Sequence, residues 1–160
     1  MDRCSGGRSV FDVIIRRVRV YFSGAIAGGR ENLPIYQRIV ARLKSLGHVV
    51  LTEHVADPNL LGPELSVSAR EVYLRDMGWL DQAEVVIAEI STPSLGVGYE
   101  IGYALQRGIP TLCAHRAGLF VSKMITGNPA PHLRIVTYRD ESELDHHITQ
   151  FLAGNSIHQP

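Results

Sequence analysis

A strand-to-helix junction at residues 88–100 constrains the fold of this chain more than any other segment. It runs from β-branched apolar residues through Ser94, Gly96 and Gly98 to the carboxylate of Glu100. In an open α/β sheet, ligands bind beyond the carboxyl ends of the strands, where the next helix begins with free N–H groups. The glycines allow a ligand to approach the backbone closely, and the helix dipole favours the charged carboxylate. The segment therefore predicts an α/β fold with a ligand crevice beside Glu100.

The composition fits one domain that binds a small molecule. The chain has 160 residues, of which 45% are hydrophobic, and its 16 basic residues balance 16 acidic ones. This length supports one core, and the neutral balance does not indicate nucleic acid or an anionic membrane as a partner. We expect a single domain at 18–153, preceded by a flexible extension at 1–17 and followed by a tail at 154–160.

Cysteine usage and the N-terminal sequence indicate an intracellular protein. Cys4 falls in the expected extension and Cys113 in an expected buried strand, so a disulfide between them is not expected. No apolar run approaches the ~20 residues of a membrane span. The Arg-rich start lacks the apolar region of a signal peptide, and Asp2 and Asp12 argue against a mitochondrial address. The expected location is the cytoplasm, the nucleus or both.

Apolar, β-branched segments alternate with helical patterns along the chain. Strands are expected at 18–24, 48–53, 84–90, 109–114 and 134–138, and helices at 34–46, 68–80, 96–107, 119–125 and 141–152. Ser68 and Glu71 form a capping-box pattern, and the third strand is almost continuously apolar, as a parallel strand covered on both faces should be. The order predicts a Rossmann-like or flavodoxin-like α/β fold, with an open parallel five-stranded sheet and helices on both faces.

The stretch from 54 to 66 has no period and contains Pro58, Gly62 and Pro63. This composition predicts a loop long enough to cover a site. A lid and a plain surface loop both fit the pattern.

Two carboxylates, Asp76 and Glu100, stand out by position, because one lies on the second helix and the other begins the third. Retaining cleavage of a glycosidic bond uses such a pair, in which one carboxylate attacks the anomeric carbon and a second group manages the proton of the leaving group. The alternatives are a solvated helix face for Asp76, beside Arg75, and a simple dipole preference for Glu100.

The turn after the first strand, from Ser23 to Arg30, is rich in glycine and is suited to a backbone nest for phosphate, with Arg30 as a countercharge. It lacks the Lys-Ser/Thr ending of a Walker motif, and the glycines at 96–102 do not fit the dinucleotide fingerprint. The seven histidines and two cysteines show no metal-ligand spacing. We therefore expect no metal and no cofactor, and the absence of a G-x-S-x-G elbow argues against a serine hydrolase.

Taken together, these motifs resemble the 2′-deoxynucleoside 5′-phosphate N-hydrolases of the nucleoside 2-deoxyribosyltransferase superfamily. The resemblance covers about residues 18–140. The segments that carry it are Tyr21-Phe22-Ser23-Gly24, Gly28-Gly29-Arg30-Glu31, Leu51-Thr52-Glu53-His54-Val55, Asp76 with Trp79-Leu80, and Pro93-Ser94-Leu95-Gly96-Val97-Gly98-Tyr99-Glu100.

The resemblance implies hydrolysis of the N-glycosidic bond of a deoxynucleoside monophosphate. Glu100 would be the nucleophile, Asp76 would assist proton transfer to the departing base, and Tyr21 would hold Glu100 in place. It also implies a homodimer, in which a serine of the partner subunit completes the phosphate site and Ser122 occupies the matching position. The substrate-binding residues implied in this way are Gly24, Ala25, Ile26, Ala27, Gly28, Gly29, Arg30, Ser94, Gly96, Ser122, Lys123 and Met124.

Two positions depart from the family pattern. Ala25 and Ala27 stand where family members commonly have serine and arginine, so one hydroxyl and one positive charge are missing from the phosphate loop. A charge-assisted hydrogen bond is worth about 1.5–3 kcal/mol, and Arg30 or Lys123 would have to compensate. Three alternatives therefore stay open: base exchange, a nucleotide-binding module without turnover, and a flavodoxin-like protein for another small anion.

Overall fold

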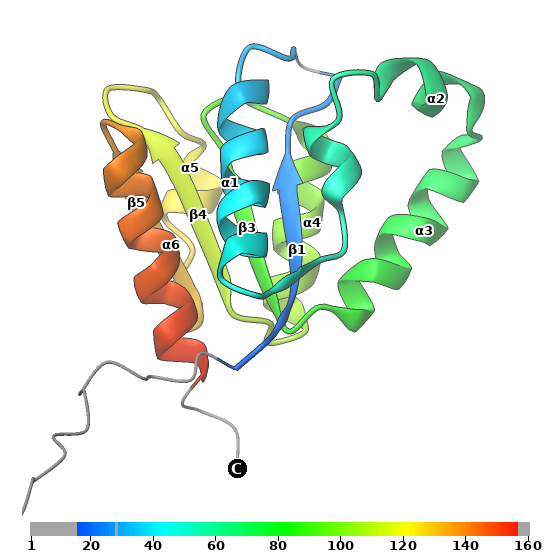
Figure 1. Ribbon diagram of the computed structural model, residues 1–160. Coiled ribbons are helices and arrows are strands. Elements are labelled where there is room, and N and C mark those ends of the chain that lie inside the picture. The colour runs from blue at the N-terminus through cyan, green and yellow to red at the C-terminus, as the bar shows by residue number, and fades with distance from the viewer. Residues whose placement is uncertain (1–15, 28, 157–160) are drawn as a thin grey trace, which may run out of the picture.

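Alternating apolar segments of the chain pair into one parallel sheet (Figure 1). The computed structural model describes residues 16–27 and 29–156. The five strands are arranged in the order β2-β1-β3-β4-β5, so the chain reverses its winding direction at β1. Their bounds are Arg19–Gly24 (β1), Val49–Val50 (β2), Val85–Glu89 (β3), Thr111–Arg116 (β4) and Leu133–Tyr138 (β5). The predicted five-stranded parallel sheet is confirmed.

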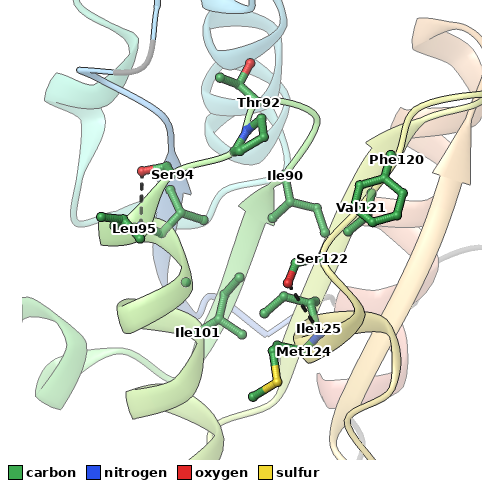
Figure 2. Close-up of a pocket in the computed structure, with 13 residues that line it drawn as sticks. Ile90, Thr92, Ser94, Leu95, Ile101, Phe120, Val121, Ser122, Met124 and Ile125 are labelled. Atoms are coloured by element: carbon green, nitrogen blue, oxygen red, sulfur yellow. Dashed lines mark hydrogen bonds between the residues drawn. The ribbon is translucent and has the colours of Figure 1, made fainter.

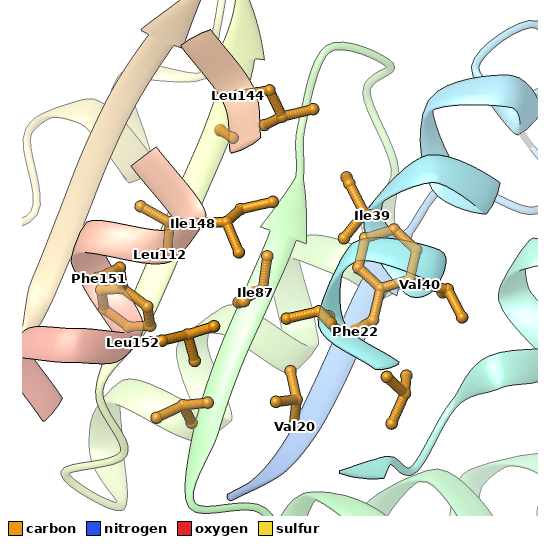
Figure 3. Packing of buried hydrophobic residues seen from close by; sticks show 14 of the residues in the cluster. Val20, Phe22, Ile39, Val40, Ile87, Leu112, Leu144, Ile148, Phe151 and Leu152 are labelled. Carbon is orange, nitrogen blue, oxygen red and sulfur yellow. The ribbon is translucent and has the colours of Figure 1, made fainter. Parts of the chain in front are cut away.

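Helices cover both faces of the sheet (Figure 1). Their bounds are Leu33–Ser45 (α1), Glu53–Ala56 (η1, a 3₁₀ turn), Leu61–Ser66 (α2), Ala69–Gln82 (α3), Leu95–Gln106 (α4), Lys123–Thr126 (α5) and Glu141–Ser156 (α6). On one face, α1 and α6 pack against the sheet through a cluster that includes Phe22, Ile39, Ile87, Leu112 and Ile148 (Figure 3). This cluster is the main core of the described residues.

The opposite face of the sheet carries α3, α4 and α5 in two smaller clusters. Tyr21 and Val86 pack with Leu80 of α3, while Cys113 packs with Ile101 of α4. Because side chains alternate along a strand, Tyr21 points to this face and Phe22 to the other. The alternation of β1 therefore directs Tyr21 and Ser23 toward α4.

The second strand is shorter than the sequence predicts, because a side chain takes over its hydrogen bonds. The prediction of a strand at 48–53 was wrong beyond Val50. Thr52 accepts a hydrogen bond from Phe22 N at 2.9 Å and donates one to Phe22 O at 2.6 Å, both through Oγ1. The Thr52 hydroxyl thus satisfies the main-chain N–H and C=O groups of Phe22 that a longer β2 would have paired, and the main chain continues into η1.

The stretch 54–66 is not a plain loop, since it contains most of η1 and all of α2. Pro63 lies in the first turn of α2, where a missing N–H removes no helical hydrogen bond. The capping box is confirmed: Ser68 Oγ accepts from Glu71 N, and Glu71 accepts from Ser68 N at 3.0 Å. The fifth helix is also shorter than 119–125, because Ser122 caps it at Lys123.

Several predictions fall on residues that the structure does not describe. Cys4, Gly28, most of the expected extension and the end of the expected tail lie outside the described residues. Cys113 is buried with a free thiol. Within residues 16–27 and 29–156, no helix is long and apolar enough to cross a membrane.

Candidate active site

Glu100 is held by two hydroxyl groups from one strand. Tyr21 Oη donates to Glu100 Oε1 at 2.9 Å, and Ser23 Oγ donates to Glu100 Oε2. Tyr21 and Ser23 are two positions apart on β1, so both side chains face α4. The hydrogen bonds occupy both carboxylate oxygens and fix the orientation of the group.

The surroundings of Glu100 make its charged form costly. Burial raises the pKa of Glu100, the hydrogen bonds from Ser23 and Tyr21 oppose this shift, and the charge of Asp76 adds to it. The net direction is upward. The expectation that Glu100 begins this helix was wrong, because α4 begins at Leu95 and has no acidic residue in its first turn, so the helix dipole does little to favour the charged carboxylate. Burial, followed by the charges of Glu100 and Asp76, also raises the pKa of Tyr21, which therefore stays a hydrogen-bond donor. A partly desolvated carboxylate with a fixed orientation is suited to act as a nucleophile.

Asp76 lies close enough to this pair to act on it electrostatically, as its effects on the pKa values of Tyr21 and Glu100 show. It does not lie on a solvated helix face, because its side chain is only 19% exposed and Arg75 Nε contacts its Oδ1 at 2.9 Å. The structure therefore brings the three predicted catalytic residues, Tyr21, Asp76 and Glu100, to one region.

His54 and Trp79 adjoin the same region. Their ring centroids are 5.2 Å apart, and the Arg75 guanidinium lies over the Trp79 ring at 5.1 Å. Burial, together with the positive charge of Arg75, lowers the pKa of His54. His54 is therefore a neutral side chain at neutral pH rather than a fixed cation.

The loop after β1 is anchored to the core at its beginning. Gly24 and Ala25 are buried, Ile26 is half-buried and Ala27 is exposed. A Cβ on Gly24 would lie 3.0 Å from Tyr36 Cζ, so only glycine fits there without a shift. Gly29 has a φ of 122°, a conformation that favours glycine. Among the described residues at the beginning of this loop, Ala27 is the one exposed to solvent.

Arg30 stands beside this loop, but its terminal nitrogens bind protein carbonyls. Nη1 donates to Val55 O at 3.1 Å and Nη2 donates to Asp57 O at 2.5 Å. Arg30 thus fastens the segment after β2 to the loop after β1. Its positive charge stays next to the loop, while a direct contact with phosphate would require these bonds to rearrange.

The N-terminus of α4 provides a second polar wall. Ser94 caps the helix and its Oγ accepts from Val97 N at 3.4 Å. The N–H groups of Leu95 and Gly96 lie in the first helical turn, where no preceding helical carbonyl is available. This arrangement is typical of an anion site.

A cavity of about 480 Å³ lies between α4 and α5 (Figure 2). Ser94 and Leu95 line one side, and Ser122 and Met124 line the other. Glu100 faces β1 instead, so Ser122, Lys123 and Met124 lie on a different flank of α4 from the Glu100 carboxylate. Within one copy of the chain, the structure does not bring these three residues to Glu100.

Sequence reasoning missed three contributors to the site. Ser23 begins the glycine-rich turn that the sequence predicts as a phosphate nest, whereas its hydroxyl binds Glu100. Arg75 and Glu64 form an ion pair at 2.6 Å, a contact between separate helices that no local spacing signals. In the described part of the chain, no group of three or more His, Cys, Asp or Glu residues is arranged to hold a metal ion.

Known proteins share both the sequence and the fold of this chain. It is 38% identical over 151 residues, 94% of each chain, to a "Putative 2'-deoxynucleoside 5'-phosphate N-hydrolase 1" of Methanosarcina mazei. It is 51% identical over 112 residues, 68% of each chain, to the "5-hydroxymethyl-dUMP N-hydrolase" of Rattus norvegicus. The resemblance inferred from the motifs is confirmed by these relatives.

Solved structures with low sequence identity have the same fold. A CMP N-glycosidase of Clostridium botulinum aligns with a TM-score of 0.63 at 19% identity, covering 83% of this chain and 98% of that one. A 2-deoxyribosyltransferase of Bacillus psychrosaccharolyticus aligns with a TM-score of 0.61 at 18% identity, covering 84% and 95%. The sequence model of the family described as "Nucleoside 2-deoxyribosyltransferase" matches residues 20–123, and the chain belongs to this family.

Proposed function

We propose that this protein hydrolyses the N-glycosidic bond of 2′-deoxynucleoside 5′-monophosphates, giving a free base and 2-deoxyribose 5-phosphate. The observation that carries the proposal is the placement of Glu100 between Tyr21 and Ser23, close to Asp76. The names of the N-hydrolase relatives support the choice of bond and of substrate class.

In the proposed mechanism, a Glu100 oxygen attacks C1′ of the deoxyribose. The C1′–N bond breaks, and its electron pair leaves with the base, which takes up a proton with the assistance of Asp76. Water then attacks C1′ of the deoxyribosyl-Glu100 intermediate, which releases the sugar phosphate and restores the carboxylate. Two displacements at C1′ retain its configuration. Tyr21 and Ser23 keep the nucleophile in line with this carbon throughout.

The 5′-phosphate would bind between the loop 24–30 and the N-terminus of α4. Ser94, the first-turn amides of α4 and the backbone of the loop supply donors, and Arg30 supplies nearby positive charge. Since Ala25 and Ala27 contribute no polar side chains, most of the expected phosphate contacts are backbone contacts.

A second copy of the chain is the partner that fits the exposed apolar surface around the cavity. Leu95, Phe120 and Met124 are 97%, 80% and 82% exposed, and all three line the cavity, which Ser122 also lines. Large apolar side chains gathered in this way mark interaction surfaces. In the proposed homodimer, Ser122 and its neighbours Lys123 and Met124 reach the phosphate site of the other subunit.

The test is release of free base from a panel of deoxynucleoside monophosphates, deoxynucleosides and ribonucleotides by the wild type and by Glu100→Ala. The matched control is Glu141→Ala, which removes an exposed glutamate from the first turn of α6. We expect release from the deoxynucleoside monophosphates by the wild type and the control, and none by Glu100→Ala. Release of base by all three proteins at one rate would refute Glu100 as the nucleophile.

The same assay separates hydrolysis from base exchange. When a second free base is added, a hydrolase keeps producing 2-deoxyribose 5-phosphate, whereas a transferase produces a new nucleotide. No release from any substrate by a folded protein that binds nucleotide would instead support the binding-module alternative.

A further inference from the structure

Arg75 connects the carboxylate of Asp76 to α2, a helix with a buried N-cap residue, Leu60, but no buried residue within its own bounds. Arg75 Nε contacts Asp76 Oδ1 at 2.9 Å, and Arg75 Nη1 contacts Glu64 Oε1 of α2 at 2.6 Å. The three side chains are only 27%, 19% and 17% exposed, in the order Arg75, Asp76 and Glu64. Ion pairs shielded in this way and made through charge-assisted hydrogen bonds are more specific in geometry than exposed surface pairs.

The guanidinium group is fixed by the protein on several sides. Its Cζ lies over the ring of Trp79 at 5.1 Å, and Nη2 is buried and has no hydrogen-bond partner among the described residues. A planar fork that binds one carboxylate on each of two nitrogens holds both at a set angle, which a lysine ammonium cannot do. The position of Asp76 therefore depends on Arg75.

Helix α2 contributes no buried residue to the core. Leu61 and Leu65, at its two ends, are 44% and 87% exposed. The pair between Glu64 and Arg75 is therefore its main shielded side-chain contact with α3. Loss of that contact would loosen α2 beyond its buried N-cap residue Leu60, without removing any part of the hydrophobic core.

We propose that Arg75 is a positioning residue, which orients Asp76 for leaving-group assistance and holds α2 beside the site through Glu64. This proposal rests on the proposed hydrolase function. A base that leaves C1′ takes an electron pair with it, so the group that assists must stay aligned with the breaking C1′–N bond. In this arrangement α2 acts as a covering segment whose position is tied to a catalytic side chain.

The titratable and charged groups around Asp76 come from five elements. They are Tyr21 of β1, His54 of η1, Glu64 of α2, Arg75 of α3 and Glu100 of α4. Arg75 is the permanent cation in this set. Replacing it removes the positive partner that two carboxylates share, while Glu64→Gln removes only the connection to α2.

The experiment compares Arg75→Met, Arg75→Lys and Glu64→Gln in the full-length protein. The matched control is Arg70→Met, an exposed arginine at the beginning of the same helix. Two quantities are measured: kcat and KM on the deoxynucleoside monophosphate that the wild type hydrolyses fastest, and hydrogen–deuterium exchange of residues 61–66 without substrate. The exchange measurement does not require activity.

For Arg75→Met, we expect a decrease in kcat of about tenfold or more, since a charge-assisted contact is lost, with a smaller change in KM. Arg75→Lys should retain more of kcat than Arg75→Met. Both Arg75→Met and Glu64→Gln should speed hydrogen–deuterium exchange over residues 61–66. Glu64→Gln should reduce kcat less than Arg75→Met does. Arg70→Met should change neither quantity.

Two results would overturn the inference. The first is a kcat of Arg75→Met and Arg75→Lys within twofold of the wild type, while Asp76→Asn is impaired. The second is unchanged exchange over 61–66 in both Arg75→Met and Glu64→Gln. A wild-type protein with no activity on any monophosphate would refute the proposed function instead, and the exchange results would still decide whether Arg75 holds α2.

Discussion

The hydroxyl of Tyr36 accepts a hydrogen bond from Ala25 N at 3.0 Å and so fastens the beginning of the proposed phosphate loop to α1. The Tyr36 ring lies directly against Gly24, the last residue of β1. Tyr36 is fully buried, and burial and the charge of Glu89 raise its pKa to about 12. The loop is thus supported from the face of the sheet opposite Glu100.

Tyr36→Phe should destabilise the protein by about 1–3 kcal/mol, because it leaves the Ala25 N–H buried without an acceptor. The loosened loop should also raise KM for monophosphates more than it lowers kcat. Urea unfolding and steady-state kinetics measure the two effects. The control is Tyr103→Phe, whose hydroxyl binds exposed Asp81 and should matter little to either. Equal behaviour of the two variants would show that the hydrogen bond does not support the loop.

The sequence predicts the parts of this fold that depend on local patterns. The capping box at Ser68 and Glu71 is confirmed, as is the alternation that leads to a parallel sheet, because both follow from residues close together in the chain. The predicted end of the second strand was wrong, since the Thr52 hydroxyl forms its hydrogen bonds with Phe22, a residue distant in sequence. The apolar pattern of residues 48–53 cannot predict such a long-range contact.

The same distinction applies to the candidate site. Glu100 and Tyr21 were identified from a recognisable motif, and the structure places their side chains in contact. The contact of Ser23 with Glu100 was not predicted, because strand alternation gives the face of Ser23 but not the acceptor that its hydroxyl meets. Arg75 was considered only as the neighbour of a solvated Asp76, since Glu64 reaches it from another helix. Side-chain contacts between separate helices and strands are therefore the part of the site that local sequence patterns do not predict.

Tyr21→Phe should move the pH dependence of hydrolysis. Burial raises the pKa of Glu100 above its ordinary value of 4.5, and the Tyr21 hydrogen bond opposes that shift. The nucleophile must be ionised, so kcat/KM should fall as the pH drops through the raised pKa. Without the Tyr21 hydroxyl, this acidic limb should move to higher pH. A kcat/KM profile of the two proteins measures the shift, and movement to lower pH would contradict the role of Tyr21.

Glu100→Gln should change how stability depends on pH. Since its pKa is raised in the folded state, the folded protein binds this proton more tightly than the unfolded chain does. Glu100 therefore lowers the free energy of unfolding as the pH rises from 4.5 through the raised pKa. The difference in unfolding free energy, variant minus wild type, should increase with pH over this window. Urea unfolding at several pH values tests this, and a difference that decreases with pH would contradict it.

Met124→Glu should weaken the proposed dimer. The side chain is 82% exposed in a single copy, and in the dimer the new charge would lie in an apolar contact. We expect association to weaken by about thirtyfold or more, the effect of losing about 2 kcal/mol at an interface centre. Sedimentation equilibrium measures it. Leu65→Glu on α2, which alters a side chain that is 87% exposed, is the control and should leave the dimer intact. A monomeric wild type would refute the dimer itself.

Ala27→Arg should increase the preference for phosphorylated substrates. Ala27 is exposed on the loop after β1, beside the proposed phosphate site, so an added guanidinium has room to extend toward the 5′-phosphate. A charge-assisted hydrogen bond of about 1.5–3 kcal/mol corresponds to roughly a tenfold to hundredfold gain in kcat/KM for monophosphates over deoxynucleosides.

Ala27→Gln is the control for this gain, because it adds a side chain of similar reach without charge. It should leave the substrate preference close to that of the wild type, and the advantage of Ala27→Arg should shrink at high salt, where charge contacts are screened. If both variants raise the preference equally, length and not charge is responsible. If neither does, Arg30 and the backbone donors already supply the phosphate contacts, and the two alanines have not reduced selectivity for the nucleotide.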